Sequence, residues 1–291
     1  MYLMLLLLPP LYIASYTYII YHYEACNADS VPPPPKGPWA LTLGIAQSFC
    51  GMLMALLASL AHPFMRGRGI IRNTSAKLRP PVILVHGTYH NTGAWLLYRF
   101  WLAKAGYARV YCPSYRVPLG NISQGDGPAF LAGVIEKAVS DVERLWPGEK
   151  PLLVGHSAGG LLLRLWLCGQ GAEQRLRGAI TLATPHQGTR MARIAFWTPG
   201  HLHSAFSFRS PFLTSLEQAE RPSKIPCTAI YSRTDNIIVP EQGMLPPKML
   251  GWNVRATTVP ASHLWLLWHK TVCRQVIEEL ESIISSTDPR S

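Results

Sequence analysis

One five-residue motif constrains the fold of this chain more than any other feature. Gly155-His156-Ser157-Ala158-Gly159 follows the apolar run PLLVG at 151–155 and precedes a helical stretch at 158–168. Glycines two positions either side of a serine leave room for a tight turn from a strand into a helix, with the hydroxyl above the sheet. The alternative is a serine in an incidental glycine-rich turn. The position between a buried strand and a helix favours the first interpretation, a nucleophile elbow.

The chain after Pro80 supplies the context that such an elbow requires. Short apolar runs alternate with helical patterns, which is typical of a mostly parallel sheet with helices on both faces. We expect strands near 81–86, 108–112, 151–155, 178–183, 226–231 and 254–259, and helices near 94–105, 128–145, 158–168 and 272–284. The pattern therefore predicts an α/β domain of about six strands over 80–284, followed by a polar tail at 285–291.

A serine hydroxyl becomes a good nucleophile only when a base removes its proton and a third group orients that base. In strand–elbow–helix domains the acid and then the histidine follow the serine along the chain. Asp235 comes after the strand at 226–231, and His263 comes after the last strand. We predict these two residues as partners of Ser157. The alternatives are Glu241 for the acid and, among the histidines after the serine, His186, His201, His203 and His269.

Backbone N–H groups are the expected donors to a negatively charged tetrahedral intermediate, because they are fixed before the reaction. One donor is predicted at Ala158, directly after the serine. The second is predicted at Thr88, in the loop after the first strand, where Gly87 lets the backbone turn towards Ser157. For His86 a structural role in shaping this loop is expected. The sequence predicts no cofactor and no metal, since no His/Cys cluster has metal-ligand spacing.

Residues 1–62 contain two uncharged apolar segments, at about 3–23 and 39–61. The second has the length needed to span a bilayer. Pro9 and Pro10 interrupt the first, and tyrosines crowd its far half, which favours a kinked helix with an interfacial tyrosine belt. A cleaved signal peptide competes with this interpretation, although no basic residue precedes the apolar run and no clear cleavage site follows it. We predict a membrane anchor of two hydrophobic helices.

Charge next to the anchor predicts its orientation. The linker at 63–79 is basic and contains no acidic residue, so the positive-inside rule places the catalytic domain on the cytoplasmic side, in a bacterial inner membrane. The net charge of +11 suits anionic lipid head groups. Nucleic acid is not expected as a partner, because no recognition motif accompanies the charge. Six scattered cysteines favour free thiols in a reducing compartment.

Five segments resemble those of α/β-hydrolase fold serine lipases and esterases, particularly bacterial triacylglycerol lipases and GPI inositol-deacylase-like lipases. They are PVILVHGTYHN (81–91), LLVGHSAGGLL (152–162), TLATPHQGT (181–189), YSRTDNIIVP (231–240) and ASHLWLL (261–267). The resemblance covers about 80–284 and implies ester hydrolysis without a cofactor and a cap inserted at about 186–224. Little chain precedes Pro80 for extra antiparallel strands, so a minimal sheet is expected. The membrane pair is unlike secreted lipases.

The sequence thus predicts a membrane-anchored serine hydrolase that cleaves carboxylic esters of acyl lipids or other apolar substrates. Acyl transfer and thioester cleavage on the same residues are alternatives, as is a non-catalytic membrane scaffold, although no member of the triad is missing. Apolar and aromatic residues over 188–217 either line an acyl pocket and touch a membrane or form ordinary cap packing, and both interpretations stay open. The sequence predicts neither the particular substrate nor the oligomeric state.

Overall fold

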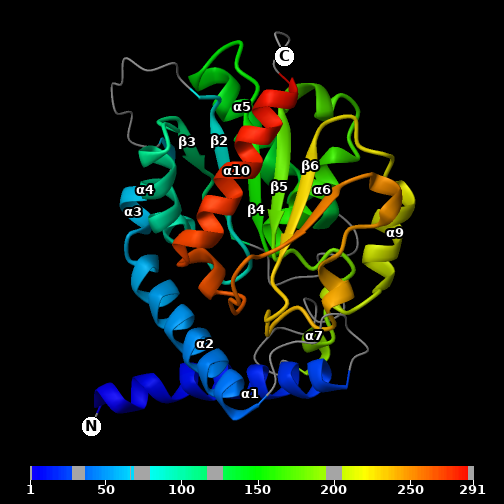
Figure 1. Ribbon diagram of the computed structural model, residues 1–291. Helices are drawn as coiled ribbons and strands as arrows, with labels where there is room; N and C mark the ends of the chain where they lie inside the picture. The colour runs from blue at the N-terminus through cyan, green and yellow to red at the C-terminus, as the bar shows by residue number, and fades with distance from the viewer. Residues whose placement is uncertain are drawn as a thin grey trace.

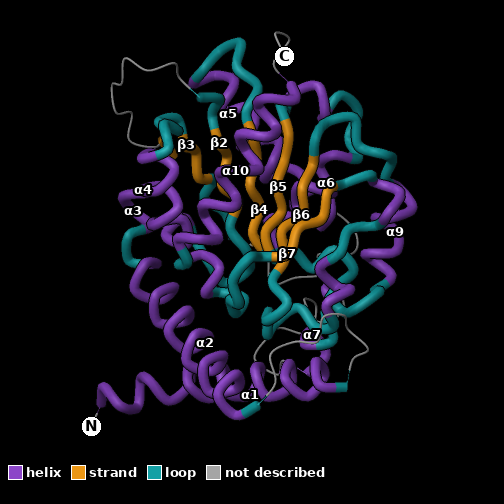
Figure 2. Tube along the Cα trace, viewed as in Figure 1, coloured by secondary structure: helices purple, strands orange, loops and turns teal. Residues whose placement is uncertain are grey.

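A single twisted sheet forms the centre of the molecule (Figures 1 and 2). The computed structural model describes residues 2–27, 37–65, 67–68, 79–116, 127–194 and 205–287. Within these residues seven strands lie in the order β1-β3-β2-β4-β5-β6-β7. Their bounds are β1 Gly67–Arg68, β2 Val82–Val85, β3 Val110–Cys112, β4 Leu152–His156, β5 Gly178–Leu182, β6 Cys227–Tyr231 and β7 Asn253–Ala256. β2 to β7 are parallel, and the two-residue β1 pairs antiparallel with β3, which confirms the predicted fold of about six mostly parallel strands.

Helices cover both faces of the sheet, and the alternation of side chains along each strand divides the core accordingly. In β2, Val82 and Leu84 pack with one set of helices, whereas Ile83 and Val85 pack with the other. The helices on the first face are α4 Leu96–Lys104 and α10 Lys270–Thr287, and those on the second are α5 Gly127–Leu145, α6 Ala158–Leu167 and α9 Pro211–Ala219. All four residues of β2 are buried, as expected of a strand covered on both sides.

The strand order creates a crevice at the carboxyl end of β2 and β4. After β2 the chain moves outwards to β3 and then returns across β2 to form β4. Binding sites in open α/β sheets lie at such a switch point. Because Val85 pairs with Gly155, the loops that follow these two residues begin side by side. The register therefore brings the loop after His86 next to Ser157.

A buried ion pair ties α9 to α6 beneath the segment that joins β5 to β6. The Arg164 guanidinium is fully buried and binds both carboxylate oxygens of Glu220, at 2.7 Å and 2.6 Å. It also donates to the carbonyl oxygen of His186 at 2.5 Å. Three nitrogens of the guanidinium thus have acceptors, two of them on the Glu220 carboxylate. Because His186 and Glu220 lie near the two ends of the segment between β5 and β6, Arg164 holds both ends in place.

Removing one partner of this pair should destabilise the protein strongly, because the other charge is then left buried and unpaired. We expect Glu220→Ala to lower the free energy of unfolding by about 3–5 kcal/mol. The half-exposed pair between Arg175 and Glu143 provides the control, and Glu143→Ala should cost no more than about 1 kcal/mol. Urea denaturation of both purified variants measures the difference. Equal losses in the two variants would contradict the structural role of the buried pair.

Two hydrophobic helices precede the domain, as predicted, followed by the short α3. Their bounds are α1 Tyr2–Cys26, α2 Pro38–Ser59 and α3 His62–Met65. Pro9 and Pro10 lie inside α1, which is a single helix from Tyr2 to Cys26. Among the described residues α2 alone is long and apolar enough to cross a membrane. Figure 1 shows α1 crossing α2 at the end of the molecule where α7 (Met191–Ile194) lies, while α2 runs up towards α3 and α4.

Glycines allow α1 and α2 to approach their neighbours closely. A Cβ atom on Gly44 of α2 would lie 1.7 Å from Cζ of Tyr18 in α1, so a larger residue would displace the Tyr18 ring. A Cβ atom on Gly93 would lie 1.9 Å from the carbonyl oxygen of Ala58, at the other end of α2. The two helices are therefore packed against each other and against the catalytic domain.

Several sequence-based boundaries differ from the structure or lie outside the described residues. β7 ends at Ala256 rather than near 259, and α10 continues to Thr287 rather than ending near 284. Most of the basic linker, at 66 and 69–78, lies outside the described residues, as does 195–204 of the expected cap. The division into anchor, linker, catalytic domain, cap and tail remains a prediction. All six cysteines are free, as expected.

Candidate active site

The turn between β4 and α6 has the shape that the glycine-rich motif predicts. β4 ends at His156 and α6 begins at Ala158, which leaves Ser157 alone at the corner with φ 53° and ψ −126°. A Cβ atom on Gly159 would lie 2.4 Å from the carbonyl oxygen of Val85, so a larger residue would push α6 away from β2. The strained backbone of Ser157 is held by the hydrogen bond from its N–H to the Leu182 carbonyl oxygen at 2.9 Å.

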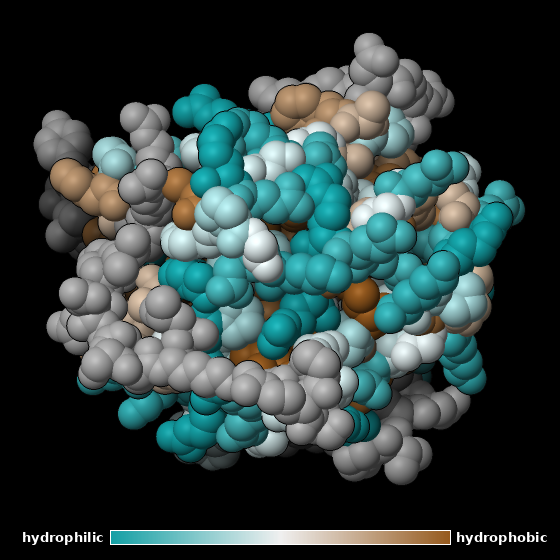
Figure 3. Space-filling view, turned by 90° about the horizontal axis from the view of Figure 1, so that it is seen from above, coloured by the Kyte–Doolittle hydropathy of each residue, from teal (hydrophilic) through white to brown (hydrophobic). Residues whose placement is uncertain are grey.

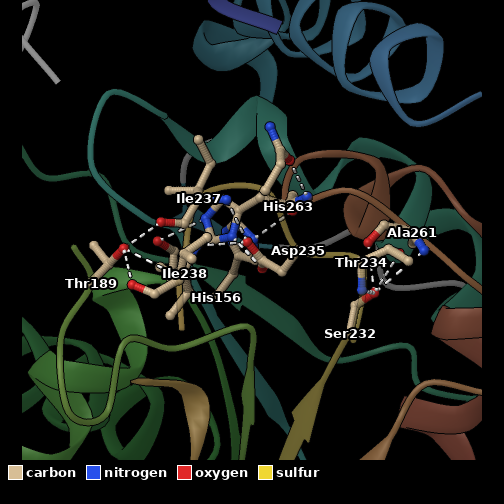
Figure 4. A network of polar contacts seen from close by, with 12 residues as sticks. His156, Thr189, Ser232, Thr234, Asp235, Ile237, Ile238, Ala261 and His263 are labelled. Atoms are coloured by element: carbon tan, nitrogen blue, oxygen red, sulfur yellow. Dashed lines mark hydrogen bonds and ion pairs between the residues drawn. The ribbon is translucent and has the colours of Figure 1, made fainter. Parts of the chain in front are cut away.

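The structure brings the three predicted residues together in one hydrogen-bonded chain. Ser157 Oγ lies 3.1 Å from Nε2 of His263, and Nδ1 of the same ring lies 2.7 Å from Oδ2 of Asp235 (Figure 4 shows the His263–Asp235 part). All three side chains are buried or nearly so. This is the geometry in which an imidazole accepts the serine proton while a carboxylate fixes its tautomer.

The second carboxylate oxygen of Asp235 is fixed by the loop that follows it. Oδ1 accepts hydrogen bonds from the N–H groups of Ile237 and Ile238, at 2.8 Å and 2.9 Å. The alternative residues lie elsewhere. Glu241 begins the short helix η3 (Glu241–Met244), His186 bonds to Thr181 Oγ1, and His269 Nδ1 accepts from Thr271 N at the start of α10. His201 and His203 lie outside the described residues.

Both predicted oxyanion donors lie close to Ser157, one at the start of α6 and one in the loop after β2. Ala158 is the first residue of α6, so its N–H has no acceptor within the helix. Thr88 follows Gly87, and a Cβ atom on Gly87 would lie 2.9 Å from Cβ of Ser157. The next residue, Tyr89, has a left-handed backbone conformation with φ 60°, which reverses the direction of the loop. Thr88 and Ala158 line the same pocket as Ser157, as the predicted role requires.

Sequence reasoning missed the groups that hold the main chain of His263. The His263 N–H donates to Oδ1 of Asn236 at 3.2 Å, and the His263 carbonyl oxygen accepts from Nε2 of His156 at 3.3 Å. Thr189 fixes the acid loop in a similar way, because its hydroxyl donates to Ile237 O at 2.6 Å and accepts from Val239 N at 3.0 Å (Figure 4). The only sequence signal for Asn236 is its position directly after Asp235.

Two other histidines beside the site are buried and neutral. Burial lowers the pKa of His86 to about 4, and its ring stacks on Tyr115 with centroids 4.2 Å apart. His86 Nδ1 donates to the carbonyl oxygen of Gly87 at 2.9 Å, which agrees with the structural role expected for it. Burial also lowers the pKa of His156, with the nearby His263 contributing to the shift.

These depressed pKa values predict a loss of stability in acid. The unfolded chain binds a proton at His86 below about pH 6.5, whereas the folded protein resists protonation until about pH 4. The free energy of unfolding is therefore highest above pH 6.5. It falls as the pH drops from 6.5 to about 4, and His86 contributes about 3 kcal/mol to this loss. Urea denaturation between pH 7 and pH 4 measures it. His86→Gln should reduce the slope, and a stability independent of pH would contradict the prediction.

An apolar pocket of about 440 Å³ opens beside Ser157. This volume is in the range of small-molecule sites in proteins. The segment after β5 contributes Thr189, Met191, Ala192 and Phe206, whereas Phe212 and Leu213 are buried in the core against α5 and α6. One part of the apolar 188–217 segment therefore lines a pocket, and another part packs in the core. Phe196, Trp197 and Leu202 lie outside the described residues.

The N-terminal helices also line this pocket, which the sequence analysis did not predict. Ile13 of α1 and Met52, Ala55 and Leu56 of α2 form one wall. The loop after β2 and the residues of the elbow also line the pocket. The predicted anchor is therefore part of the site.

The sequence matches a known family over most of this domain. Residues 82–283 match the model of the alpha/beta hydrolase family. The match covers more than half of the chain, and the chain belongs to the alpha/beta hydrolase family. A search of curated protein sequences finds no match.

Solved structures of lipases have a similar fold. The mature form of Bacillus licheniformis lipase BlEst2 aligns with a TM-score of 0.58 and 15% identity, over 73% of this chain and 96% of the lipase. Aspergillus fumigatus lipase B aligns with a TM-score of 0.57 and 16% identity, over 74% of this chain and 56% of that one. At these identities the likeness shows the fold alone.

Proposed function

We propose that this protein is a membrane-bound serine hydrolase that cleaves carboxylic esters of apolar acyl groups. The observation that carries the proposal is the hydrogen-bonded chain from Ser157 Oγ through His263 to Asp235, at the mouth of an apolar pocket. The membership of the alpha/beta hydrolase family and the fold shared with two lipases support it. The lining favours an uncharged acyl group, because most of it consists of aliphatic, aromatic and small side chains.

The geometry supports a two-step reaction through an acyl-enzyme. Ser157 Oγ attacks the carbonyl carbon while His263 Nε2 takes the hydroxyl proton, and Asp235 holds the resulting imidazolium. The N–H groups of Thr88 and Ala158 stabilise the oxyanion. As the C–O bond breaks, His263 returns the proton to the departing alkoxide. Water then attacks the acyl-enzyme with His263 again as base, which releases the carboxylic acid and restores Ser157.

The surface of the two N-terminal helices supports membrane attachment. Large apolar side chains on α1, α2 and α3 are exposed, which a water-facing surface of this size rarely shows. They are Leu8, Leu11, Tyr12, Ile19, Tyr23, Trp39, Leu43, Leu56, Leu57, Leu60 and Phe64. Figure 3 shows the far end of the molecule, where hydrophilic side chains dominate the described surface. We propose that lipid contacts α1 and α2 and that the basic stretch after α2 keeps the catalytic domain on the cytoplasmic side.

Hydrolysis of a panel of esters tests the proposed activity. Purified full-length protein in lipid nanodiscs is given nitrophenyl esters of increasing acyl length, triacylglycerols and phospholipids. We expect cleavage of uncharged esters with release of the free acid. If none of the esters is cleaved, or if alcohols compete fully with water for the acyl group, hydrolysis is the wrong assignment.

Reporter fusions at the C-terminus of the full chain test the orientation. In a bacterial host, green fluorescent protein should fluoresce and alkaline phosphatase should be inactive, because the phosphatase folds only after export. An active phosphatase fusion would place the catalytic domain on the opposite side of the membrane.

A further inference from the structure

A polar network buried among apolar residues connects both N-terminal helices to the catalytic loop. Nδ2 of Asn236 donates to Thr17 Oγ1 of α1 at 2.6 Å and to Ser48 Oγ of α2 at 3.0 Å. The same amide accepts the N–H of His263 through Oδ1. Thr17, Ser48 and Asn236 are at most 3% exposed. If the helices moved away, the buried amide of Asn236 would lose its hydrogen-bond acceptors, which costs free energy. The network therefore favours helices that stay packed beside His263.

Further contacts hold the helix pair against the domain along its length. The indole N–H of Trp268 donates to the Gly51 carbonyl oxygen of α2 at 3.2 Å. At the far end of α1, the Tyr21 hydroxyl donates to the Arg233 carbonyl oxygen at 2.7 Å, and Glu24 forms an ion pair with Arg190 at 2.8 Å. A helix pair that served only as a tether would need none of these contacts.

The wall that the helices present to the pocket is apolar. Ile13, Met52, Ala55 and Leu56 contribute hydrocarbon or thioether surface. The Ser59 hydroxyl, which also lines the pocket, already donates to a carbonyl oxygen of its own helix at 2.6 Å. Ser48 of α2 lines the pocket as well, and its Oγ accepts from Nδ2 of Asn236 at 3.0 Å. The wall is therefore mostly apolar, which suits a hydrocarbon chain.

The rim of the pocket is continuous with the exposed apolar surface of α2. Leu56 and Tyr89 line the pocket and are also 62% and 63% exposed. Leu57 of the same helix and Leu60, directly after its end, are also exposed and extend the apolar surface outwards from Leu56. A hydrocarbon chain can therefore pass from a lipid phase into the pocket along apolar side chains throughout.

We propose that α1 and α2 form the acyl-binding subsite of the enzyme, so that the membrane-attaching helices themselves select a long hydrocarbon chain and guide it to Ser157. The inference rests on the proposed ester hydrolysis and adds the class of substrate, an ester of a long-chain fatty acid. Ile13, Met52 and Ala55 are the residues that set the length and width of the chain that fits.

Substitutions of α2 in the full-length protein test this subsite. Ala55→Phe narrows the pocket and should lower kcat/KM for nitrophenyl palmitate relative to butyrate by about tenfold or more, since a misfit of even one methylene group costs at least this factor. Met52→Ala widens the pocket and should shift the preference towards longer chains. Ala46→Phe is the matched control, because Ala46 is exposed on the same helix outside the pocket lining, and its palmitate-to-butyrate ratio should equal that of the wild type.

A binding measurement separates the subsite from the chemistry. In a Ser157→Ala background, Ala55→Phe should weaken binding of a fluorescent long-chain fatty acid by about tenfold, and Ala46→Phe should leave it unchanged. Weakened binding in a protein that cleaves no ester would uphold the subsite and refute the proposed activity. Unchanged chain-length ratios and unchanged binding in both Ala55→Phe and Met52→Ala, in proteins that melt at the wild-type temperature, would overturn the subsite and leave the activity standing.

Discussion

Replacing Ser157 by alanine should lower kcat for a short nitrophenyl ester by about 10⁶-fold, which is the size of effect seen when a serine hydrolase loses its nucleophile. The acyl-enzyme cannot form without the hydroxyl, and His263 then has no proton to remove. Alanine retains the Cβ atom of serine, so the substitution removes the reacting oxygen and adds no bulk at this backbone position of φ 53°.

The control for this variant is a serine far from the pocket. Ser285 is exposed on α10 and donates to the Glu281 carbonyl oxygen of its own helix. Ser285→Ala should retain wild-type kcat, and initial rates with matched enzyme concentrations measure both. Activity of Ser157→Ala within tenfold of the wild type would assign the reaction to another group.

Replacing Asp235 by asparagine should lower kcat by about 10⁴-fold with little effect on folding. Oδ1 accepts two backbone N–H groups, from Ile237 and Ile238, and the asparagine oxygen would keep these bonds. Its NH₂ group would then face Nδ1 of His263. That nitrogen would have to accept a hydrogen bond, which leaves the ring proton on Nε2, where it blocks uptake of the Ser157 proton.

Glu241→Gln distinguishes the two acids considered from the sequence. Glu241 lies in η3, and the carboxylate bonded to the histidine belongs to Asp235. We expect Glu241→Gln to keep kcat within a factor of about two. A large loss of kcat in Glu241→Gln together with an active Asp235→Asn would reverse the assignment.

The proximity of Ser157, His263 and Asp235 was predictable because the sequence signal of each is local and the parallel sheet brings the three together. The motif around Ser157 needs only a strand before it and a helix after it, and both were visible as apolar runs. Asp235 and His263 follow strands that belong to the same parallel sheet, whose carboxyl ends lie at one edge. β7 was placed less well because its residues are exposed or half-buried, so its pattern of apolar residues is weak.

The role of the N-terminal helices was not predictable in the same way. A long uncharged helix satisfies its backbone internally and suits either lipid or the apolar surface of a protein, so composition does not distinguish the two. The contacts that show the helices packing against the domain join Thr17 and Ser48 to Asn236, and these residues are far apart in the sequence. The close approach of Gly44 to Tyr18 is likewise seen only in the structure.

Reaction with a fluorophosphonate probe examines the proposed nucleophile itself. Such a probe forms a stable covalent adduct only with a serine that a neighbouring base has activated. Intact-mass and peptide analysis of the labelled full-length protein should show one adduct, on Ser157, which is absent from Ser157→Ala and strongly reduced in Asp235→Asn. An adduct on a different residue, or labelling that persists in Ser157→Ala, would contradict the assignment of Ser157, His263 and Asp235 as a catalytic triad.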